Sequence, residues 1–294
     1  MSDAPEPGPS ASLGFPPSAS DTRALVRAAL DEDRAFEDVT TLATVPPDAQ
    51  GHAAIVARSA GVIAGLPLAI AAFETMSESV RVRIVLGDGA HVAAGGVVAE
   101  VAGPWRALLS AERVALNFSQ RLSGVATLTA RYVAAVRGTH ARIYDTRKTT
   151  PGFRALEKYA VRCGGGVNHR ADLADAVLIK DNHLAALGGD IALAVRRARE
   201  IGRPGICVEL ECDDAAQVEA ALAAGADVIL LDNMSLDAMR ACVKRVAGRV
   251  PLEASGGVTL DRVRAIAETG VDRISVGGLT HSAPALDLGL DYRQ

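Results

Sequence analysis

The second half of this 294-residue chain repeats one pattern, and that repetition limits the possible folds more than any other feature. After Gly138, short β-prone runs recur, most of them end in a charged or glycine-bearing turn, and alanine-rich helical stretches separate them. The runs are ARIYDTRK, AVLIKDN, ICVELEC, VILLDN, VPLEASGG and RISVGG. Such β-α-β-α repetition predicts a parallel sheet with helices outside it. The near-continuous apolar runs are typical of strands that are covered on both faces.

The absence of one glycine motif and the length of the repeated segment indicate which type of parallel sheet forms. No Rossmann-type GxGxxG follows the first strand, which favours a closed or nearly closed α/β barrel over a doubly wound sheet. The stretch from Gly138 to Gln294 is short for eight βα units, which typically need ~250 residues. We therefore predict an incomplete α/β barrel of six or seven parallel strands.

The first half of the chain has a different organisation. Residues 1–20 are rich in Pro, Ser and Gly and predict a disordered tail, and Asp21-Thr22 precede a helical run over 23–31. Runs rich in Val and Ile at 52–58 and 80–86, followed by glycine turns, predict a small, sandwich-like β-rich part. The predicted domains are the tail (1–20), an N-terminal α/β domain (21–137) and the barrel (138–294). We leave open whether the last residues return to the N-terminal domain.

Two helices are predicted at the end of the N-terminal domain. Apolar residues spaced three and four apart form a helical stripe. This stripe consists of Leu108, Ala111, Ala115, Phe118 and Leu122, and a second set is Val125, Leu128, Tyr132 and Val136. Arg113 lies two positions past Ala111, about 200° round a helix of ~3.6 residues per turn, so it is expected to point away from the first stripe.

Composition excludes several classes of protein. The formal charge is −4, which argues against a general nucleic-acid binder. The longest apolar stretch, 61–73, is too short for a membrane span, and no charged signal-peptide region precedes Arg23. The four cysteines have neither CxxC nor metal-ligand spacing, which predicts reduced thiols in a cytoplasmic protein. We expect neither nucleic acid nor membrane as a partner.

Polar residues at the ends of the predicted strands are the main clue to function, because the active site of an α/β barrel forms at the carboxyl ends of its strands. The ionisable residues at these ends are Lys148, Lys180, Glu211, Asp232 and Glu253. A structural ion-pair network is the alternative interpretation. Glu211 and Asp232 are candidates to bind a hard cation such as Mg²⁺ or to stabilise developing positive charge.

Two further groups of residues predict a polyanionic substrate. Ser255-Gly256-Gly257 and Val276-Gly277-Gly278 follow consecutive late strands, where glycine turns commonly bind phosphate. Arg147-Lys148 and His169-Arg170, together with Lys180, supply cations suited to carboxylate or phosphate. Neither the ligand spacing of a tightly bound transition metal nor the nucleophile elbow of a serine hydrolase is present.

The segment DTRKTTPGFRALEKYAVRCGGGVNHR, followed by LIKDNH, VELE, LLDN, EASGG and VGGLTHS, resembles the quinolinate phosphoribosyltransferases, also called carboxylating nicotinate-nucleotide pyrophosphorylases. The match runs in order from about residue 21 and includes SAERVALN around Arg113. The resemblance implies transfer of the phosphoribosyl group of phosphoribosyl pyrophosphate to quinolinate, with release of pyrophosphate and CO₂, to give nicotinate mononucleotide for NAD synthesis. It also implies a homodimer in which the N-terminal domain of one subunit covers the barrel mouth of the other, and leaves open assembly into a hexamer.

The resemblance assigns roles to individual residues. Those implied to hold the two quinolinate carboxylates are Arg113 (from the neighbouring subunit), Arg147, His169, Arg170 and Lys180. Those implied to contact phosphoribosyl pyrophosphate and its Mg²⁺, directly or through water, are Lys148, Glu211 and Asp232. Those implied to cradle the 5′-phosphate are Ser255, Gly256, Gly257, Gly277 and Gly278, and Thr146 and Val276 belong to the same substrate-binding blocks.

Three other functions remain open. A related phosphoribosyltransferase, including the molybdenum-locus paralogues of this family, would act on nicotinate or another small acid, and a monocarboxylate would need fewer cations. A Schiff-base lyase would use Lys148 or Lys180 at a strand end. A nucleotide-sensing barrel would bind nicotinate mononucleotide without turnover.

Overall fold

The computed structural model describes residues 14–293, so most of the predicted tail, residues 1–13, lies outside them. The chain divides into two compact units. Unit 1 contains the residues up to Thr127 together with Ala155–Gly164 and the C-terminal segment from Ala283. Unit 2 contains Leu128–Arg154 and Gly165–Ser282. The sequence pattern did not indicate that the short segment 155–164 groups with the N-terminal half.

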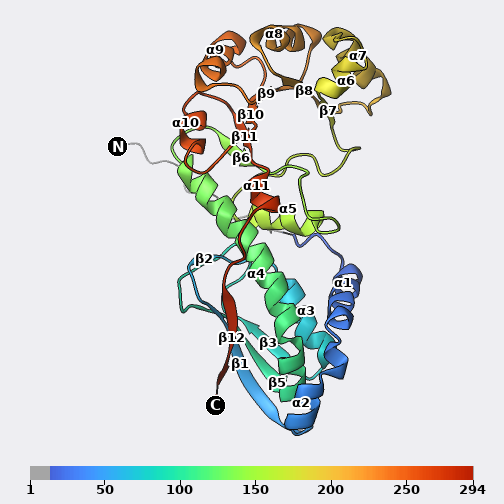
Figure 1. Ribbon diagram of the computed structural model, residues 1–294, viewed down its shortest axis with the longest axis vertical. Coiled ribbons are helices and arrows are strands. Elements are labelled where there is room, and N and C mark those ends of the chain that lie inside the picture. The colour runs from blue at the N-terminus through green and yellow to red at the C-terminus, as the bar shows by residue number, and fades with distance from the viewer. Residues whose placement is uncertain (1–13, 294) are drawn as a thin grey trace. The chain divides into compact units, whose positions relative to one another are not determined.

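Unit 1 is built on a four-stranded antiparallel sheet in the order β12-β1-β5-β3 (Figure 1). Its strands are β1 (Gln50–Ala57), β3 (Arg81–Ile84), β5 (Val97–Pro104) and β12 (Leu288–Arg293). The C-terminal strand β12 pairs with β1, and Ile55 lies opposite Leu290. Two short strands, β2 (Gly61–Val62) and β4 (His91–Val92), form a separate antiparallel pair.

Helices complete unit 1: α1 (Ala19–Glu32), η1 (Ala35–Glu37), α2 (Val39–Thr44), α3 (Leu66–Met76) and most of α5 (Arg154–Cys163). The first helix begins earlier than the sequence predicted. Ser18 is its N-cap, and the Ser18 hydroxyl accepts a hydrogen bond from the Asp21 backbone N–H at 3.1 Å. This bond satisfies one of the free donors of the first turn and extends the helix past the predicted start.

The two helices predicted after residue 104 are one helix, α4 (Trp105–Ala135). Gly124 lies near its middle and does not interrupt it. An ideal Cβ at Gly124 would lie only 2.1 Å from the carbonyl oxygen of Pro284, so the glycine permits a close approach of the C-terminal segment. A glycine used for close packing does not end a helix, which is why the prediction of two helices was wrong.

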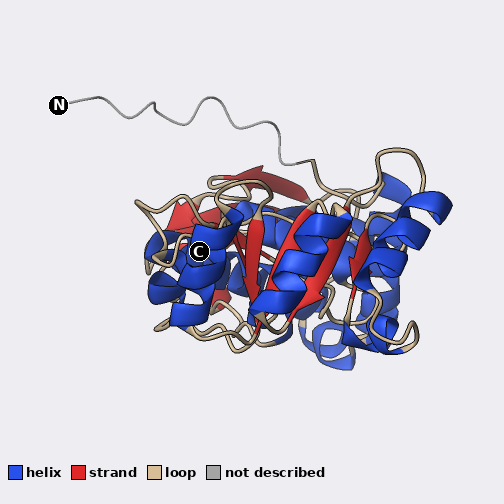
Figure 2. Cartoon of the chain, turned by 90° about the horizontal axis from the view of Figure 1, so that it is seen from above, coloured by secondary structure: helices blue, strands red, loops and turns tan. Residues whose placement is uncertain are grey.

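Unit 2 is an incomplete α/β barrel, as the sequence pattern predicted, with six strands in one parallel sheet of order β6-β11-β10-β9-β8-β7. The strands are β6 (Arg142–Tyr144), β7 (Val177–Ile179), β8 (Val208–Cys212), β9 (Val228–Asp232), β10 (Leu252–Ser255) and β11 (Arg273–Ser275). The helices are α6 (Asp181–Ala185), α7 (Ile191–Ile201), α8 (Ala215–Ala224), α9 (Leu236–Val246), α10 (Val263–Ala267) and α11 (Gly278–His281). Figure 1 shows α7, α8 and α9 outside these strands, and Figure 2 shows strands covered by helices.

A seventh strand is reduced to one bridge. Val167 pairs in parallel with Tyr144 of β6, and its backbone N–H donates to Ile143 at 2.8 Å. Within residues 14–293, β6 and β7 remain the two edges of the sheet, so the barrel does not close. In the same part of the chain, every helix is too short or too polar to span a membrane.

The close contact at Gly124 generates a test of the fold. We expect Gly124→Ala to lower the free energy of unfolding by about 1–3 kcal/mol, because the new methyl group overlaps the Pro284 carbonyl. Helix propensity alone would change stability in the opposite direction by ~1 kcal/mol. Urea unfolding measures the difference. Gly87→Ala is the matched control, since a Cβ there meets nothing within 4 Å, and equal stability of both variants would contradict the close approach.

Candidate active site

A cavity of about 620 Å³ lies in unit 2, at the carboxyl ends of the parallel strands. It is lined by Thr146, Arg147, Lys148, His169, Arg170, Leu178, Lys180, Glu211, Leu230, Asp232, Asn233, Glu253, Ser255, Gly256, Gly257 and Ser275. Side chains alternate along a strand, so residues two positions apart face the same side of the sheet, and this alternation determines which residues line the cavity. Glu211 pairs in register with Leu230 and Leu230 with Glu253, so these three side chains share the inner face.

The strand-end residues meet as their spacing implied. Lys180 directly follows β7, and Asp232 and Ser255 end β9 and β10. The Lys180 Nζ lies 2.6 Å from a carboxylate oxygen of Glu211, which forms an ion pair across the wall. Glu253 differs from the prediction, because it lies inside β10 with no exposed surface instead of at the rim.

The turn after β6 carries a group of cations. The Thr146 hydroxyl accepts the Lys148 backbone N–H at 3.1 Å, and the Thr280 hydroxyl donates to the Lys148 carbonyl at 2.7 Å. These bonds fix the turn that presents Arg147 and Lys148 to the cavity. The Nε of Arg147 is buried, and within residues 14–293 it has no hydrogen-bond partner. A buried guanidinium nitrogen in that state is suited to an anionic ligand.

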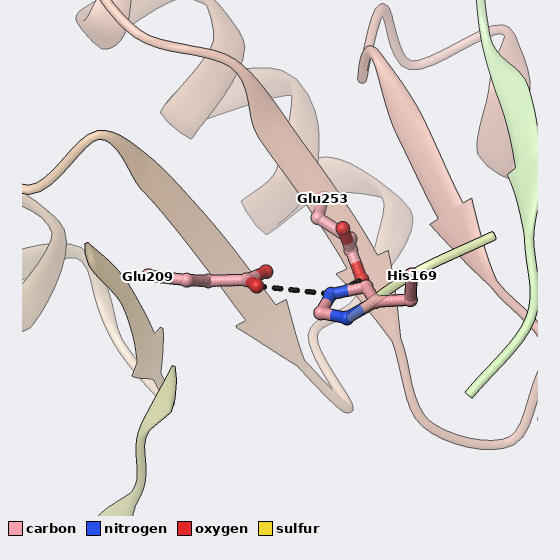
Figure 3. Close-up of side chains that lie close together, drawn as sticks. All are labelled: His169, Glu209 and Glu253. Carbon is pink, nitrogen blue, oxygen red and sulfur yellow. Dashed lines mark ion pairs between the residues drawn. The ribbon is translucent and has the colours of Figure 1, made fainter. Parts of the chain in front are cut away.

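His169 lies on the floor of the cavity between two buried carboxylates (Figure 3). Its Nε2 is 2.9 Å from Glu209 and 3.4 Å from Glu253, while its Nδ1 accepts the Arg170 backbone N–H at 2.8 Å. Burial lowers the pKa of His169 and the hydrogen bonds with Glu209 and Glu253 raise it, with a net shift upward. Burial also raises the pKa of Glu209. The Arg170 N–H opposes a charged ring, because an imidazolium carries a proton on Nδ1 and cannot accept that bond. The geometry is therefore that of a neutral ring with its proton on Nε2, facing the two carboxylates.

Asn233 is a wall residue that the sequence analysis did not single out. It follows β9 with a left-handed φ of 51°, and its side-chain amide donates to Asp232 at 2.6 Å. An ideal Cβ at Gly256 would lie 2.1 Å from the Asn233 Oδ1, and Gly256 itself has a φ of +89°. The asparagine of LLDN and the glycine of EASGG therefore pack against each other. Both belong to motifs at the ends of neighbouring strands, and this was the available signal that Asn233 lies in the wall.

Several predicted site residues lie outside this wall. Val276 is buried, and its N–H donates to the Tyr144 carbonyl at 2.9 Å. Gly277 packs against Lys148 instead, since a Cβ there would lie 3.0 Å from the Lys148 Cδ, and Gly278 begins the short helix α11. Arg113 belongs to unit 1, where it is exposed on α4 and lines a separate hollow of about 710 Å³.

Two sets of side chains have the chemistry of a metal site. Glu211 and Asp232 offer carboxylate oxygens on the cavity wall, which are the ligands that Mg²⁺ prefers. His169, Glu209 and Glu253 have ligand atoms within 4.8 Å of one another. The His169 Nε2 would need a lone pair for a metal, whereas the Arg170 hydrogen bond places the ring proton on that atom. The donor set therefore fits Mg²⁺ at Glu211 and Asp232 better than a metal at His169.

Comparison with known proteins gives a consistent result over most of the chain. Residues 38–123 match the family model for the quinolinate phosphoribosyl transferase N-terminal domain, and residues 125–291 match the model for the C-terminal domain. The nicotinate-nucleotide pyrophosphorylase [carboxylating] of Mycobacterium leprae is 46% identical over 277 residues, covering 92% of this chain and 96% of that protein. A probable enzyme of the same name from Bacillus subtilis is 46% identical over 240 residues, covering 82% and 83%.

A solved structure agrees with the sequence relatives. The nicotinate-nucleotide pyrophosphorylase from Francisella tularensis superimposes with a TM-score of 0.89 at 38% identity, over 95% of this chain and 99% of that one. Both domains and the fold are therefore shared along nearly the full length. This chain belongs to the quinolinate phosphoribosyltransferase family.

Proposed function

We propose that this protein transfers the phosphoribosyl group of phosphoribosyl pyrophosphate to quinolinate, releasing pyrophosphate and CO₂ and forming nicotinate mononucleotide for NAD synthesis. Family membership and the names of the relatives support this reaction. The observation that carries it is one cavity wall on which Arg147, Arg170 and Lys180 lie together with Glu211 and Asp232. Such a wall suits a dicarboxylate and a phosphorylated sugar side by side.

The cations would bind and orient the anionic groups. A guanidinium offers a planar fork to a carboxylate, so Arg147 and Arg170 are the proposed contacts of the quinolinate carboxylates, assisted by Lys180. Lys148, exposed on the same wall, is the proposed contact of the pyrophosphate. Ser255, Gly256 and Gly257 line the cavity and are the proposed cradle of the 5′-phosphate.

The carboxylates would act during transfer. The bond from the ribose C1 to pyrophosphate breaks as the quinolinate nitrogen attacks, and the sugar develops oxocarbenium character that nearby negative charge stabilises. Glu211 and Asp232 are the proposed source of that charge and would also hold Mg²⁺, directly or through water. Mg²⁺ supplies charge neutralisation for the departing pyrophosphate. The C2–carboxylate bond then breaks, CO₂ leaves, and the positively charged ring stabilises the electron pair left on C2 until a proton arrives.

Substrate choice tests the proposed reaction. With phosphoribosyl pyrophosphate and Mg²⁺, we expect turnover of quinolinate to CO₂ and nicotinate mononucleotide, and very poor turnover of nicotinate. The reason is that a wall with several cations leaves charge uncompensated when one carboxylate is missing. Product chromatography and CO₂ release measure both. Equal rates with the two acids would reject the assignment in favour of a nicotinate-type enzyme.

The carboxylates can be tested separately from folding. Asp232→Asn and Glu211→Gln keep shape and remove charge, so kcat should fall by about 10²-fold or more if the charge stabilises the transition state. Asp237→Asn, on the outer helix α9 with an exposed carboxylate, is the matched control and should leave kcat unchanged. Unchanged turnover in both wall variants would make these carboxylates structural.

We also propose a homodimer in which Arg113 serves the active site of the neighbouring subunit. Arg113 is exposed on α4, on the side away from the buried Leu108 and Ala115, so it takes no part in the core of unit 1. Its position in SAERVALN supports the role that the family resemblance implies. In a two-fold dimer, both sites would then share residues from both subunits.

Complementation tests this arrangement. Arg113→Ala and Lys148→Ala should each be nearly inactive, because each loses a charge-assisted contact to substrate. Mixed under conditions of subunit exchange, they should regain up to half of the wild-type activity per mixed dimer, since one site carries both defects and the other carries neither. Continued inactivity in a demonstrated mixed dimer would contradict sharing in trans.

A further inference from the structure

Three buried carboxylates, of which Glu253 also lines the cavity, have no role in the reaction described above. Asp145 follows β6, Glu209 lies in β8 and Glu253 lies in β10, and none is more than 3% exposed. Burying a carboxylate away from water is costly unless hydrogen bonds or opposite charges compensate for it. All three contact the same short segment, residues 168–170, while one oxygen each of Glu209 and Glu253 is buried without a hydrogen-bond partner in the described residues.

Asp145 holds the backbone of this segment. One carboxylate oxygen accepts the His169 backbone N–H at 2.7 Å, and the other accepts the Asn168 side-chain amide at 2.7 Å. The neighbouring bridge from Val167 to Tyr144 keeps the start of the segment against β6. Both oxygens of Asp145 therefore serve as acceptors for residues that lead directly into the wall.

Glu209 and Glu253 hold the side chain of the same segment. The His169 Nε2 lies between them at 2.9 and 3.4 Å (Figure 3). The Ser275 hydroxyl donates to Glu253. Residues of β8 and β10 therefore contact the imidazole directly, and β11 supports it through Glu253. The next residue, Arg170, reaches the cavity with one guanidinium hydrogen bond to the Ala176 carbonyl at 3.1 Å. Its placement therefore depends on the backbone at 169–170.

We propose that Asp145, Glu209 and Glu253 are positioning residues that hold residues 168–170 in place, so that Arg170 is fixed on the wall for the substrate carboxylate. The proposal rests on the proposed function for the identity of that substrate. It assigns the acidic members of the DTRK, VELE and EASGG motifs to the support of the cation-bearing segment. They orient Arg170 from behind and do not contact the reacting atoms.

His169, Glu209 and Glu253 could instead bind a divalent metal, since their ligand atoms lie within 4.8 Å of one another. The hydrogen bond from the Arg170 N–H to the His169 Nδ1 favours the positioning role. It leaves the ring proton on Nε2, the atom that a metal would have to bind. The two roles differ in a measurable way, because a metal site would retain a stoichiometric ion.

Hydrogen exchange tests the support without any substrate. In Asp145→Asn, an amide NH₂ replaces one acceptor and faces an N–H donor, so exchange in the peptide containing 167–170 should accelerate about tenfold. Asp190→Asn is the control in unit 2. Asp190 accepts the Leu193 N–H at 2.9 Å at the start of α7, and its replacement should leave 167–170 unchanged. Equal exchange at 167–170 in both variants would overturn the proposal.

Kinetics test the consequence for Arg170. In Asp145→Asn and Glu209→Leu, KM for quinolinate should rise about tenfold or more, while KM for phosphoribosyl pyrophosphate stays within about twofold. Glu209→Gln keeps an acceptor for Nε2–H and should recover most of the quinolinate affinity. Equal increases in both KM values, no recovery by Glu209→Gln, or a stoichiometric metal lost in Glu209→Leu would each overturn the positioning role. Wild-type protein without any turnover would reject the proposed function, while the exchange experiment would still decide the proposal.

Discussion

The parallel register of β8, β9 and β10 is the constraint on which the site depends. It places Glu211, Leu230 and Glu253 at one level and Asp232 opposite Ser255 at the next. Because side chains alternate along a strand, every second residue faces inward, and the carboxyl ends of all these strands meet at one edge. Ionisable residues far apart along the chain thus become neighbours without any special loop. A slip of one residue in one strand would turn its charged residue to the helix-covered face.

The inner face carries two groups of paired charges that differ in exposure. Lys180 pairs with Glu211, and the lysine side chain is 45% exposed. Glu209, Glu253 and His169 form the other group and are nearly excluded from solvent. Electrostatic interactions strengthen as water is excluded, so the buried group is the more rigid one. A rigid buried group beside a partly exposed ion pair suits a wall that must bind and release charged molecules.

The local sequence pattern was sufficient to predict most of the barrel and many of the residues that line its cavity. The apolar runs predicted all six strands, because a strand that is covered on both faces has apolar residues along nearly its whole length. The single helix α4 was not predicted, because the reason Gly124 is tolerated is its contact with Pro284, far along the chain. The start of α1 was missed because a Ser18 cap has a weak local signal.

The features of the site that the sequence did not predict also depend on contacts between distant segments. VELE shows two glutamates on one strand face, but only the pairing with β9 and β10 shows that Glu209 lies a level deeper than Glu211. Glu253 was expected at the rim because the glycines after it suggest a turn, whereas Ser255 ends the strand. Asp145 and Asn168 belong to motifs that were recognised, yet their bond joins two segments that the chain separates by a whole helix. Partners of that kind follow from the fold and not from spacing.

The pair of Lys180 and Glu211 shows how binding of a substrate can be linked to the carboxylates proposed to act on the sugar. A substrate carboxylate bound at Lys180 would compete with Glu211 for that lysine. Glu211 is only 12% exposed, and without its lysine it becomes a poorly solvated negative charge on the wall. Such a charge is stabilised by a cation or by developing positive charge nearby. Binding of an anion at Lys180 therefore increases the affinity of the adjacent wall for positive charge, which is where displacement at a ribose carbon needs it.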